Sequence, residues 1–511
     1  MRARRLRRRP GRLTGGNATA SCGVQPDVNT LTRRSALTST AGLAATAIAG
    51  MSGCSPASAL SSSAGRKPTT QDWIAFARTV TGPVFLPGTS GYRNSKLVFD
   101  TRFDGNAPVA VMGVKRVSDV AQAMRFATKF SLQISPRGGG HSYVGASATN
   151  GTFVLDMRAL DSVSYRASDR TVAVGAGATL YDVKAQLAAH GRAIPTGTCP
   201  TVGVAGLTLG GGLGVESRAQ GLTADRLTAA QLVLPDGRSV LADAHHYSDI
   251  FWALRGGGGG NIGMVTSLRF ATHAATGKGI FTLTFPGTAA VPVMTGWARW
   301  IATAARSRWA GVHVDAIGGG RLHVSILGVT EAGDERAAAA SVLRAVGVTP
   351  VATSYLRMSY LDSVIYLGGG TTSSRQGFTA GSDVLAKLDT NTATAIRAAV
   401  IARSAAGGPG SALLDPLTGA VTGPATSATA FPWRGHVASV QWYAGGTGYT
   451  SALHWLADAH RRVAHFSSGG YVNYLETGMP AKRYYATNLP RLAQIRAHYD
   501  PARRLHSGIV V

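Results

Sequence analysis

Apolar segments, helical patterns and glycine turns alternate between residues 72 and 275, and this order predicts a domain that mixes helices with short strands. The strands are predicted at 109–114, 153–156 and 171–174, and the helices at 117–130 and 180–190. Ser118 is the expected N-cap of the first helix. Residues 231–234 and 239–242 flank Pro235-Asp236-Gly237, which predicts a hairpin with an Asp-Gly turn.

A second pattern begins near residue 276, where the glycine clusters become sparse. Strands of an antiparallel sheet are predicted at 281–285, 313–317 and 322–327, with covering helices at 332–346 and 391–405. An aromatic cluster and a helix near 489–498 follow residue 468. We therefore expect a first domain at 72–275, a second at 276–467 and a separate C-terminal segment at 468–511.

The first 71 residues have a different character. Residues 1–30 are basic and unpatterned, and the paired Arg33 and Arg34 precede a short run of small apolar residues at 38–50. This arrangement resembles a twin-arginine export signal, and the run is too short to cross a membrane as a helix. Cys54 stands in a candidate lipoprotein cleavage box, with ordinary cleavage a few residues later as the alternative. Residues 1–54 are thus expected to be tail and signal, and residues 55–71 a linker, so that an exported or surface-anchored protein is predicted.

Composition sharpens this picture in two ways. The chain of 511 residues has a net charge of +26, yet no recognition helix, zinc-finger spacing or basic-aromatic interleaving is present, so no nucleic-acid partner is expected. There are 65 glycines, many of them in runs, which favours close approach of the backbone to a ligand. Cys199 is the one cysteine of the predicted folded body, so no disulfide framework is expected there. No metal site is expected.

The first glycine run is Pro136-Arg137-Gly138-Gly139-Gly140-His141-Ser142-Tyr143. Consecutive glycines after a strand can turn several backbone N–H groups toward one anion, and Arg137 would add charge beside a diphosphate. The alternative is a glycine-rich turn that carries a surface histidine.

Two further runs lie downstream, at residues 197–214 around Cys199 and at residues 254–265 with Gly256–Gly260. The first lacks the strand-to-helix context of a Rossmann fingerprint, so a long loop against a flat cofactor is the better interpretation. Taken singly, Cys199 fits a buried inert thiol and the five glycines fit a flexible loop.

Together these three segments resemble the berberine-bridge-enzyme-like flavoprotein oxidases. Other matching stretches are residues 82–88, 221–225, 249–258, 471–474 and 499–501. The resemblance runs from about Trp73 to Asp500. It implies a two-domain α+β protein with an FAD-binding domain of the p-cresol-methylhydroxylase (PCMH) type and an antiparallel-sheet substrate domain.

The resemblance also implies how FAD is held. The histidine of the first segment bonds the flavin 8α-methyl carbon and the cysteine bonds flavin C6, which correspond to His141 and Cys199 here. Val202 falls where a small side chain accompanies oxidase behaviour. The remaining expected cofactor-binding residues are Arg137, Gly138, Gly139, Gly140, Ser142, Gly203, Gly206, Leu207, Gly210, Gly211, Gly212, Gly214, Gly263, Val265, Tyr471 and Asn473.

Catalytic residues are implied by the same resemblance. Tyr474 matches the tyrosine that takes the substrate proton, which nearby positive charge or hydrogen bonds would assist by lowering its pKa. Gln441 matches a polar residue on a strand of the substrate domain and favours alcohol oxidation. Tyr143 fits either the pocket wall or simple packing. Leu475-Glu476 departs from the family pattern, and the glycine-rich stretch 407–430 suggests an open or mobile substrate wall.

The expected reaction is oxidation of an alcohol, such as a sugar, oligosaccharide or secondary-metabolite hydroxyl, with O2 as acceptor and H2O2 as product. Two alternatives stay open. One is a flavin dehydrogenase with another acceptor, and the other is a non-catalytic surface protein that binds carbohydrate on the same scaffold.

Overall fold

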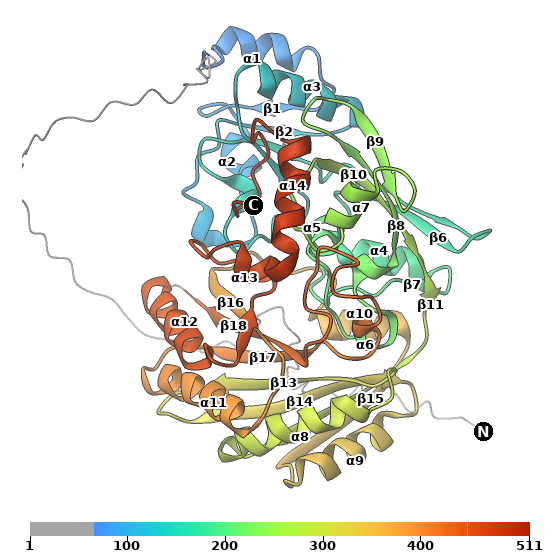
Figure 1. The fold of residues 1–511 in the computed structure, drawn as a ribbon, viewed down its shortest axis with the longest axis vertical. Coiled ribbons are helices and arrows are strands. Elements are labelled where there is room, and N and C mark those ends of the chain that lie inside the picture. The colour runs from blue at the N-terminus through green and yellow to red at the C-terminus, as the bar shows by residue number, and fades with distance from the viewer. Residues whose placement is uncertain (1–65, 447) are drawn as a thin grey trace, which may run out of the picture.

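A four-stranded and a five-stranded sheet form the N-terminal part of the fold (Figure 1). The computed structural model describes residues 66–446 and 448–511. The smaller sheet has the order β1 (Val84–Phe85), β2 (Ala110–Gly113), β4 (Phe153–Asp156) and β3 (Ile134–Arg137). Its last three strands are parallel, and β1 runs antiparallel to β2. Each parallel strand is short and mostly buried, as expected where helices and loops cover both faces.

The larger of these sheets is antiparallel. Its order is β5 (Val163–Arg166), β6 (Thr171–Gly175), β10 (Met264–Ala271), β8 (Leu227–Val233) and β9 (Ser239–Asp243). A two-stranded ribbon of β7 (Arg192–Ala193) and β11 (His273–Ala274) lies beyond it. The helices of this part are α1 (Thr70–Ala77), α2 (Tyr92–Ser95), α3 (Val117–Lys129), α4 (Leu180–Ala188), α5 (Val204–Leu209), α6 (Ser217–Gln220) and α7 (Ser248–Ala253).

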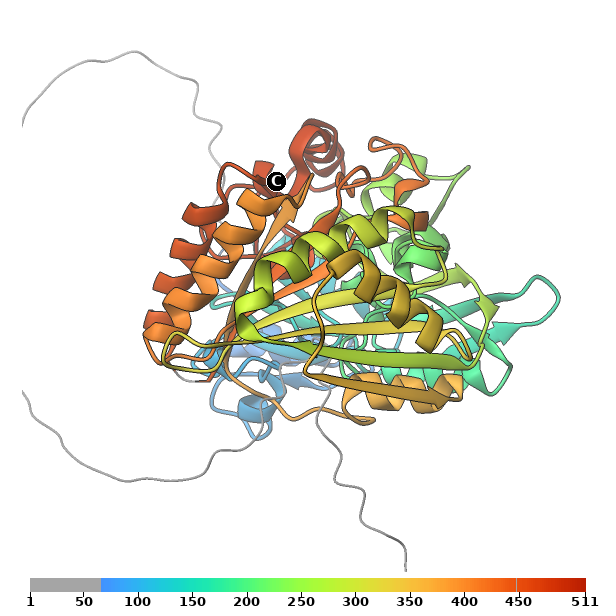
Figure 2. The same cartoon turned by 90° about the horizontal axis from the view of Figure 1, so that it is seen from below.

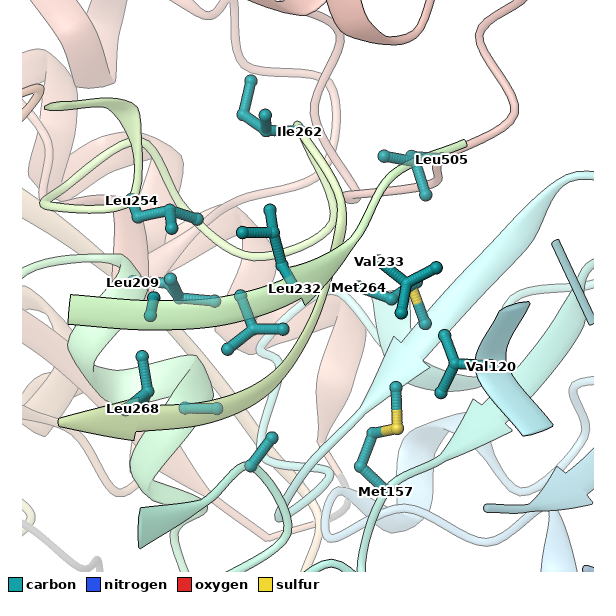
Figure 3. Packing of buried hydrophobic residues seen from close by; sticks show 14 of the residues in the cluster. Val120, Met157, Leu209, Leu232, Val233, Leu254, Ile262, Met264, Leu268 and Leu505 are labelled. Carbon is teal, nitrogen blue, oxygen red and sulfur yellow. The ribbon is translucent and has the colours of Figure 1, made fainter. Parts of the chain in front are cut away.

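A single hydrophobic core joins these two sheets. Figure 3 shows Val120 of α3 near Val233 and Met264 of β8 and β10, with Leu505 of the C-terminal tail close by. All four side chains are buried to within 1% of full burial. The burial of this apolar surface is the main force that fixes the two sheets against each other.

The strands and helices predicted for this region are confirmed within a few residues at each end, with one wrong cap. Helix α3 begins after Arg116, so Ser118 lies inside the first turn. Asp119 replaces the expected cap, because its carboxylate accepts hydrogen bonds from the backbone N–H groups of Lys115 and Arg116, at 3.1 and 3.2 Å. A carboxylate in the first turn also suits the positive end of the helix dipole.

The second part is an eight-stranded antiparallel sheet. Its order is β15 (Ala352–Met358), β12 (Lys278–Phe285), β14 (Leu322–Glu331), β13 (Trp309–Ala316), β17 (Ser411–Pro416), β18 (Ala438–Gly445), β16 (Phe378–Leu385) and β19 (Ser467–Gly469). One face is covered by α8 (Ala290–Thr303), α9 (Glu335–Val346), α11 (Thr390–Ala405) and α12 (Tyr449–Val463) (Figures 1 and 2). Helix α10 (Tyr360–Gly368) packs instead against α4.

The two faces of this sheet have different roles. Leu414, Val440 and Trp442 belong to the core beneath the helices. Because side chains alternate along a strand, Asp415 and Gln441 project from the opposite face, toward the N-terminal part. Residues 411–416 of the stretch 407–430 are therefore not the open wall suggested by its composition, since they form β17, which pairs with two neighbours.

The C-terminal segment returns to the N-terminal part. Helices α13 (Lys482–Tyr485) and α14 (Leu489–Tyr499) follow the 3₁₀ turn Val472–Tyr474, and α14 packs beside α7 (Figure 1). Beyond α14, the N–H group of Ile134 in β3 donates to the carbonyl of Arg504, and His506 donates back to Ile134. The segment thus closes against the first sheet.

The export signal and the lipid-anchor site at Cys54 lie outside the described residues, so both stay predictions. Between residues 66 and 511, with residue 447 left out, no helix combines the length and the apolar run that crossing a membrane requires.

Candidate functional site

A deep cavity lies between the N-terminal part and the eight-stranded sheet, and the three glycine segments meet in its wall. Most residues expected at a cofactor or substrate line it: Gly138, Gly139, Gly140, His141, Ser142, Tyr143, Cys199, Val202, Gly203, Gly206, Leu207, Gly263, Val265, Tyr471, Asn473 and Tyr474. The expected residues that do not line it are Arg137, Gly210, Gly211, Gly212, Gly214 and Gln441.

Arg137 has a structural position instead of the expected place beside a diphosphate. Its guanidinium is 1% exposed, donates to Asp156 at 2.8 Å and also bonds the carbonyl of Ser95. Burial lowers the pKa of Arg137, and Asp156 opposes this effect. Both of these bonds use Nη2, and Nε and Nη1 of Arg137 have no hydrogen-bond partner among the described residues.

The glycines at 210–214 are explained by protein contacts. A Cβ atom on Gly210 would lie 2.0 Å from Oδ1 of Asn473, and one on Gly214 would lie 1.9 Å from the carbonyl oxygen of Thr196. Gly212 has a φ of +85° and donates its N–H group to the hydroxyl of Tyr471 at 2.8 Å. Here glycine permits close packing of chain on chain.

Two glycines bring the His141 and Cys199 segments together. A Cβ atom on Gly139 would lie 2.2 Å from the backbone nitrogen of Gly203, and the converse distance is also 2.2 Å. Only glycine fits at both positions. The segment at 197–214 is not one long loop as predicted, because α5 begins after Gly203 and buries Val204, Ala205, Thr208 and Leu209.

The backbone of Gly138–Ser142 is free to bind an anion. None of its five N–H groups donates to an acceptor among the described residues. Unpaired donors of this kind are rare in folded proteins unless a ligand or water satisfies them. The described lining of the cavity contains no Lys or Arg side chain, so a diphosphate would depend on such backbone groups.

The wall also has open space beside α5. A Cβ atom on Gly206 would meet nothing within 4 Å, which leaves room for a flat group. The wall therefore fits FAD.

His141 is held rigidly at this wall. Its ring stacks on Phe99 with 4.0 Å between the centroids, and its Nε2 lies 3.0 Å from Oγ1 of Thr201. Burial lowers the pKa of His141 to about 4, although a hydrogen bond to the backbone of Thr201 opposes this. The imidazole is therefore neutral at physiological pH and has a lone pair for bond formation.

Cys199 lies in the same wall. Its Sγ is 3.9 Å from Oγ of Ser373, which in turn is 2.6 Å from Oγ1 of Thr201. Contrary to the expectation from the sequence, Cys199 is disulfide-bonded in the structure. A thioether to a flavin would use the same sulfur, so the disulfide and the thioether exclude each other.

Three tyrosines cluster near the eight-stranded sheet. Tyr474 stacks on Tyr143 at 5.2 Å and meets Tyr471 edge to face at 5.0 Å. The hydroxyl of Tyr143 accepts from Gln441, and that of Tyr471 accepts from Gly212 and Asn473. The Tyr474 hydroxyl alone of the three has no hydrogen bond within the described part of the chain. It is thus the one left to meet a substrate.

The pKa of Tyr474 does not follow the expectation from the sequence. Burial raises it well above the usual value, and Tyr143 and Asp415 add to the effect. Burial also raises the pKa of Tyr471 to about 12. Tyr474 is a neutral phenol in this site, so it needs a partner that takes its proton before it can accept another.

Gln441 does not line the cavity and contacts it through Tyr143. The side chain is 1% exposed, and its Nε2 donates to the hydroxyl of Tyr143 at 2.6 Å. Since Tyr143 stacks on Tyr474, Gln441 fixes the orientation of the aromatic pair. Asn473 has a similar function on the other side, because its Nδ2 donates to the carbonyl of Leu207 in α5 at 2.9 Å.

Asp415 is a candidate functional residue that the sequence analysis missed. Burial raises the pKa of its carboxyl group to about 7. Its charge also reaches Tyr143, Tyr471 and Tyr474 and raises the pKa of each. It is the one acidic residue between 407 and 430 and follows the apolar run Ala412-Leu413-Leu414. A lone acid after a short apolar run was the one available signal, and it is a weak one.

Two family models match the chain. Residues 108–242 match the model of an FAD-binding domain, and residues 470–506 match the model described as berberine and berberine-like. The first covers the His141 and Cys199 segments, and the second covers the C-terminal segment with Tyr474.

Curated relatives fall into two groups. The FAD-linked oxidoreductase pytB of Aspergillus terreus is 34% identical over 206 residues, which is 40% of this chain and 25% of that protein. The chain spans a quarter to less than half of the length of the first three relatives it matches. The carbohydrate oxidase of Microdochium nivale is 26% identical over 467 residues, or 83% of this chain and 91% of the relative.

Solved structures share the whole fold. BBE-like 1 of Physcomitrella patens superposes with a TM-score of 0.78 at 24% identity, covering 85% of this chain and 98% of that one. The Microdochium nivale carbohydrate oxidase, in complex with a substrate analogue, gives 0.78 at 24% identity with 86% and 98% covered. The chain has the PCMH-type FAD-binding fold of the berberine-bridge-enzyme-like oxidases. It carries the sequence signatures of both the FAD-binding domain and the berberine-like segment.

Proposed function

We propose that this protein is an FAD-linked oxidase of carbohydrate alcohols. The observation that carries the proposal is the row of free backbone N–H groups at Gly138–Ser142 in a cavity wall without Lys or Arg among the described residues. Such a wall suits the diphosphate of FAD, and the match of residues 108–242 to an FAD-binding domain supports the same cofactor. Bound flavin would accept a hydride from the substrate carbon.

Two covalent bonds would anchor the cofactor, one from His141 and one from Cys199. The neutral, stacked imidazole of His141 suits this role, and Cys199 lies in the same wall. The thioether requires the sulfur of Cys199 as a thiol. It would therefore form in molecules of this protein in which Cys199 is not part of a disulfide.

Proton removal would depend on Tyr474 and Asp415. As the substrate C–H bond releases its hydride, the hydroxyl proton passes to the oxygen of Tyr474, whose own proton passes to the Asp415 carboxylate. A carbonyl product results, and the proton is held on Asp415. Tyr474 lines the cavity and Asp415 does not, so the carboxylate acts through the phenol.

A sugar or oligosaccharide is the proposed substrate class, and O2 the proposed acceptor. The similarity to a carbohydrate oxidase over 83% of the chain supports the first point. Gln376 and Tyr443 also supply polar groups to the cavity wall beside the eight-stranded sheet. The small side chain of Val202 in the wall supports the second point.

The test is turnover of the purified holoenzyme in air with a panel of monosaccharides, oligosaccharides and simple alcohols. We expect H2O2 release in step with carbonyl formation for at least one sugar, and none in the Tyr474→Phe variant with equal flavin content. Reduction of an artificial dye without peroxide would show that the acceptor is wrong. A flavin-loaded protein that neither makes peroxide nor reduces the dye would contradict the oxidase proposal.

A further inference from the structure

Four charged side chains form a buried cluster away from the cavity. Asp383 lies on β16, His460 on α12, and Glu476 and Arg483 on the C-terminal segment. The two nitrogens of His460 lie 2.6 Å from Oδ2 of Asp383 and 2.6 Å from Oε2 of Glu476. Arg483 lies 2.9 Å from Oδ1 of Asp383. The exposed fractions of the Asp383 and Glu476 side chains are 1% and 6%.

This geometry requires a doubly protonated imidazole. A neutral ring could donate to one carboxylate only and would leave the other facing a lone pair. Burial lowers the pKa of His460, but hydrogen bonds and charge from Asp383 and Glu476 outweigh it and raise the pKa to about 9. Arg483 lies 3.1 Å from Nδ1 of His460, a contact of like charges that the carboxylates offset. The positive charges of His460 and Arg483 then balance the negative charges of the two carboxylates.

No other charged group bonds to His460 within the described residues. The adjacent helix α11 carries Arg397 and Arg403, and Arg403 bonds instead to the carbonyl of Pro409 and to Ser451. Trp442 of β18 donates to Oδ2 of Asp383 at 2.8 Å, the same oxygen that His460 contacts. The protonation state of His460 therefore decides whether the cluster is neutral or carries one net negative charge.

The cluster and the adjacent Ser382 hold the backbone on both sides of Tyr474. Before it, the N–H group of Tyr471 donates to Oγ of Ser382 at 2.8 Å. After it, the carboxylate of Glu476 accepts from the N–H group of Ser382 at 3.3 Å. A Cβ atom on Gly381 would lie 2.3 Å from the Glu476 carboxyl carbon, so glycine makes room for this contact. Residues 471–476 are thus fastened to β16 through Ser382 and the Asp383–His460–Glu476 chain.

We propose that protonated His460 is a positioning residue, which fixes Tyr474 in the cavity by binding Glu476 to β16. The proposal rests on the proposed function, in which Tyr474 accepts the substrate proton. His460 does not line the cavity, so it acts only through the position of the tyrosine. Loss of its proton leaves two buried carboxylates without their shared partner, and the 471–476 segment loosens.

The experiment compares the wild-type holoenzyme with His460→Gln and with the double variant His460→Gln/Glu476→Gln. In the single variant we expect kcat to fall by about tenfold to a hundredfold, because misplacement of a catalytic group costs this much. KM and flavin content should stay within about twofold, since neither depends on proton transfer. The double variant restores a neutral hydrogen-bonded pair, so kcat should recover toward the wild-type value.

The pH profile and hydrogen exchange separate positioning from general damage. The wild-type kcat should fall as the pH rises through about 9, and this alkaline limb should vanish in His460→Gln. Amide exchange of the 471–476 peptide should accelerate in the single variant at pH 7. In the wild type, the protection factor of this peptide, which corrects for base-catalysed intrinsic exchange, should fall above pH 9. Unchanged protection in both cases would overturn the proposal, as would a single variant with wild-type kcat and alkaline limb.

The two proposals fail in different ways. A wild-type protein that binds flavin but turns over no substrate would refute the oxidase function, while the exchange of the 471–476 peptide would still decide the role of His460. If His460→Gln does not fold, the protection factors of this peptide in the wild type at pH 7 and pH 10, each corrected for intrinsic exchange, give the same comparison without a substitution.

Discussion

Burial sets the acid and base properties of Tyr474 in the cavity wall and of Asp415 behind it. It raises the pKa of Tyr474 well above its usual value and that of Asp415 to about 7. A tyrosine with a raised pKa cannot accept a proton unless it releases its own. Asp415 is ionised above about pH 7, and in the proposed mechanism it takes that proton, so a neutral phenol works with a carboxylate near neutral pH.

The pair predicts an acidic limb in the pH profile of the reaction. Because the carboxylate is the active form, kcat/KM should fall as the pH falls through about 7. Asp415→Asn should remove this limb and lower kcat by about 100-fold or more, the usual size of a lost acid-base group. Steady-state peroxide release between pH 5 and pH 9 measures both effects.

Asp458→Asn is the matched control for this substitution. Among the residues that the structure describes, Asp458 bonds only to Arg461 and Arg462 of its own helix, so the same change of charge should leave the profile as in the wild type. An Asp415→Asn variant that keeps its acidic limb would show that another group titrates.

Sequence reasoning found part of this chemistry. The Tyr-Val-Asn-Tyr motif indicated Tyr474 by its resemblance to a family segment, and the position of Tyr474 in the cavity wall fits that role. It did not indicate Asp415, because one acid in a glycine-rich stretch has no local pattern, and its significance arises only when β17 brings it beside the tyrosines. The ion pair of Arg137 with Asp156 was also not predicted, since the two residues are 19 positions apart in the sequence.

At the level of elements, the glycine segments have two physical functions. Gly139 and Gly203 let one backbone pack on another, whereas Gly206 in α5 faces open space. The sequence showed that glycine was needed but not which neighbour required it. The same limit applies to β17. Its composition suggested a mobile wall, because the sequence does not show the two strands that pair with it.

Gly206 offers a test of the cofactor site. Gly206→Leu should fill the space against which the flavin would lie and reduce flavin content by about tenfold or more. Leucine favours helix more than glycine, so α5 itself should not be weakened. Absorbance of purified protein, relative to its concentration, gives the flavin content.

Gly435→Leu serves as the control, because Gly435 is exposed and a Cβ atom there also meets nothing within 4 Å. Its flavin content should equal that of the wild type. Full flavin loading in Gly206→Leu would mean that the cofactor does not lie against α5.

At the scale of the whole molecule, the site is assembled from parts that are distant along the chain. The segments at 138–142 and 199–207 come from the N-terminal part, Gln441 and Asp415 from the large sheet, and residues 471–474 from the returning C-terminal segment. Periodicity predicted many of the strands and helices, since it is a local property. The meeting of these segments depends on long-range packing, which only the family resemblance anticipated.

The same resemblance supplies the central claim, that FAD is bonded to both His141 and Cys199. Its most direct test is the flavin absorbance of acid-precipitated protein, combined with mass spectrometry of its proteolytic peptides. We predict that the precipitate stays yellow and that one flavin links the peptides containing His141 and Cys199. His141→Ala and Cys199→Ala should each retain flavin through the other bond, and the double variant should lose it. A colourless wild-type precipitate, with both peptides unmodified, would contradict the account.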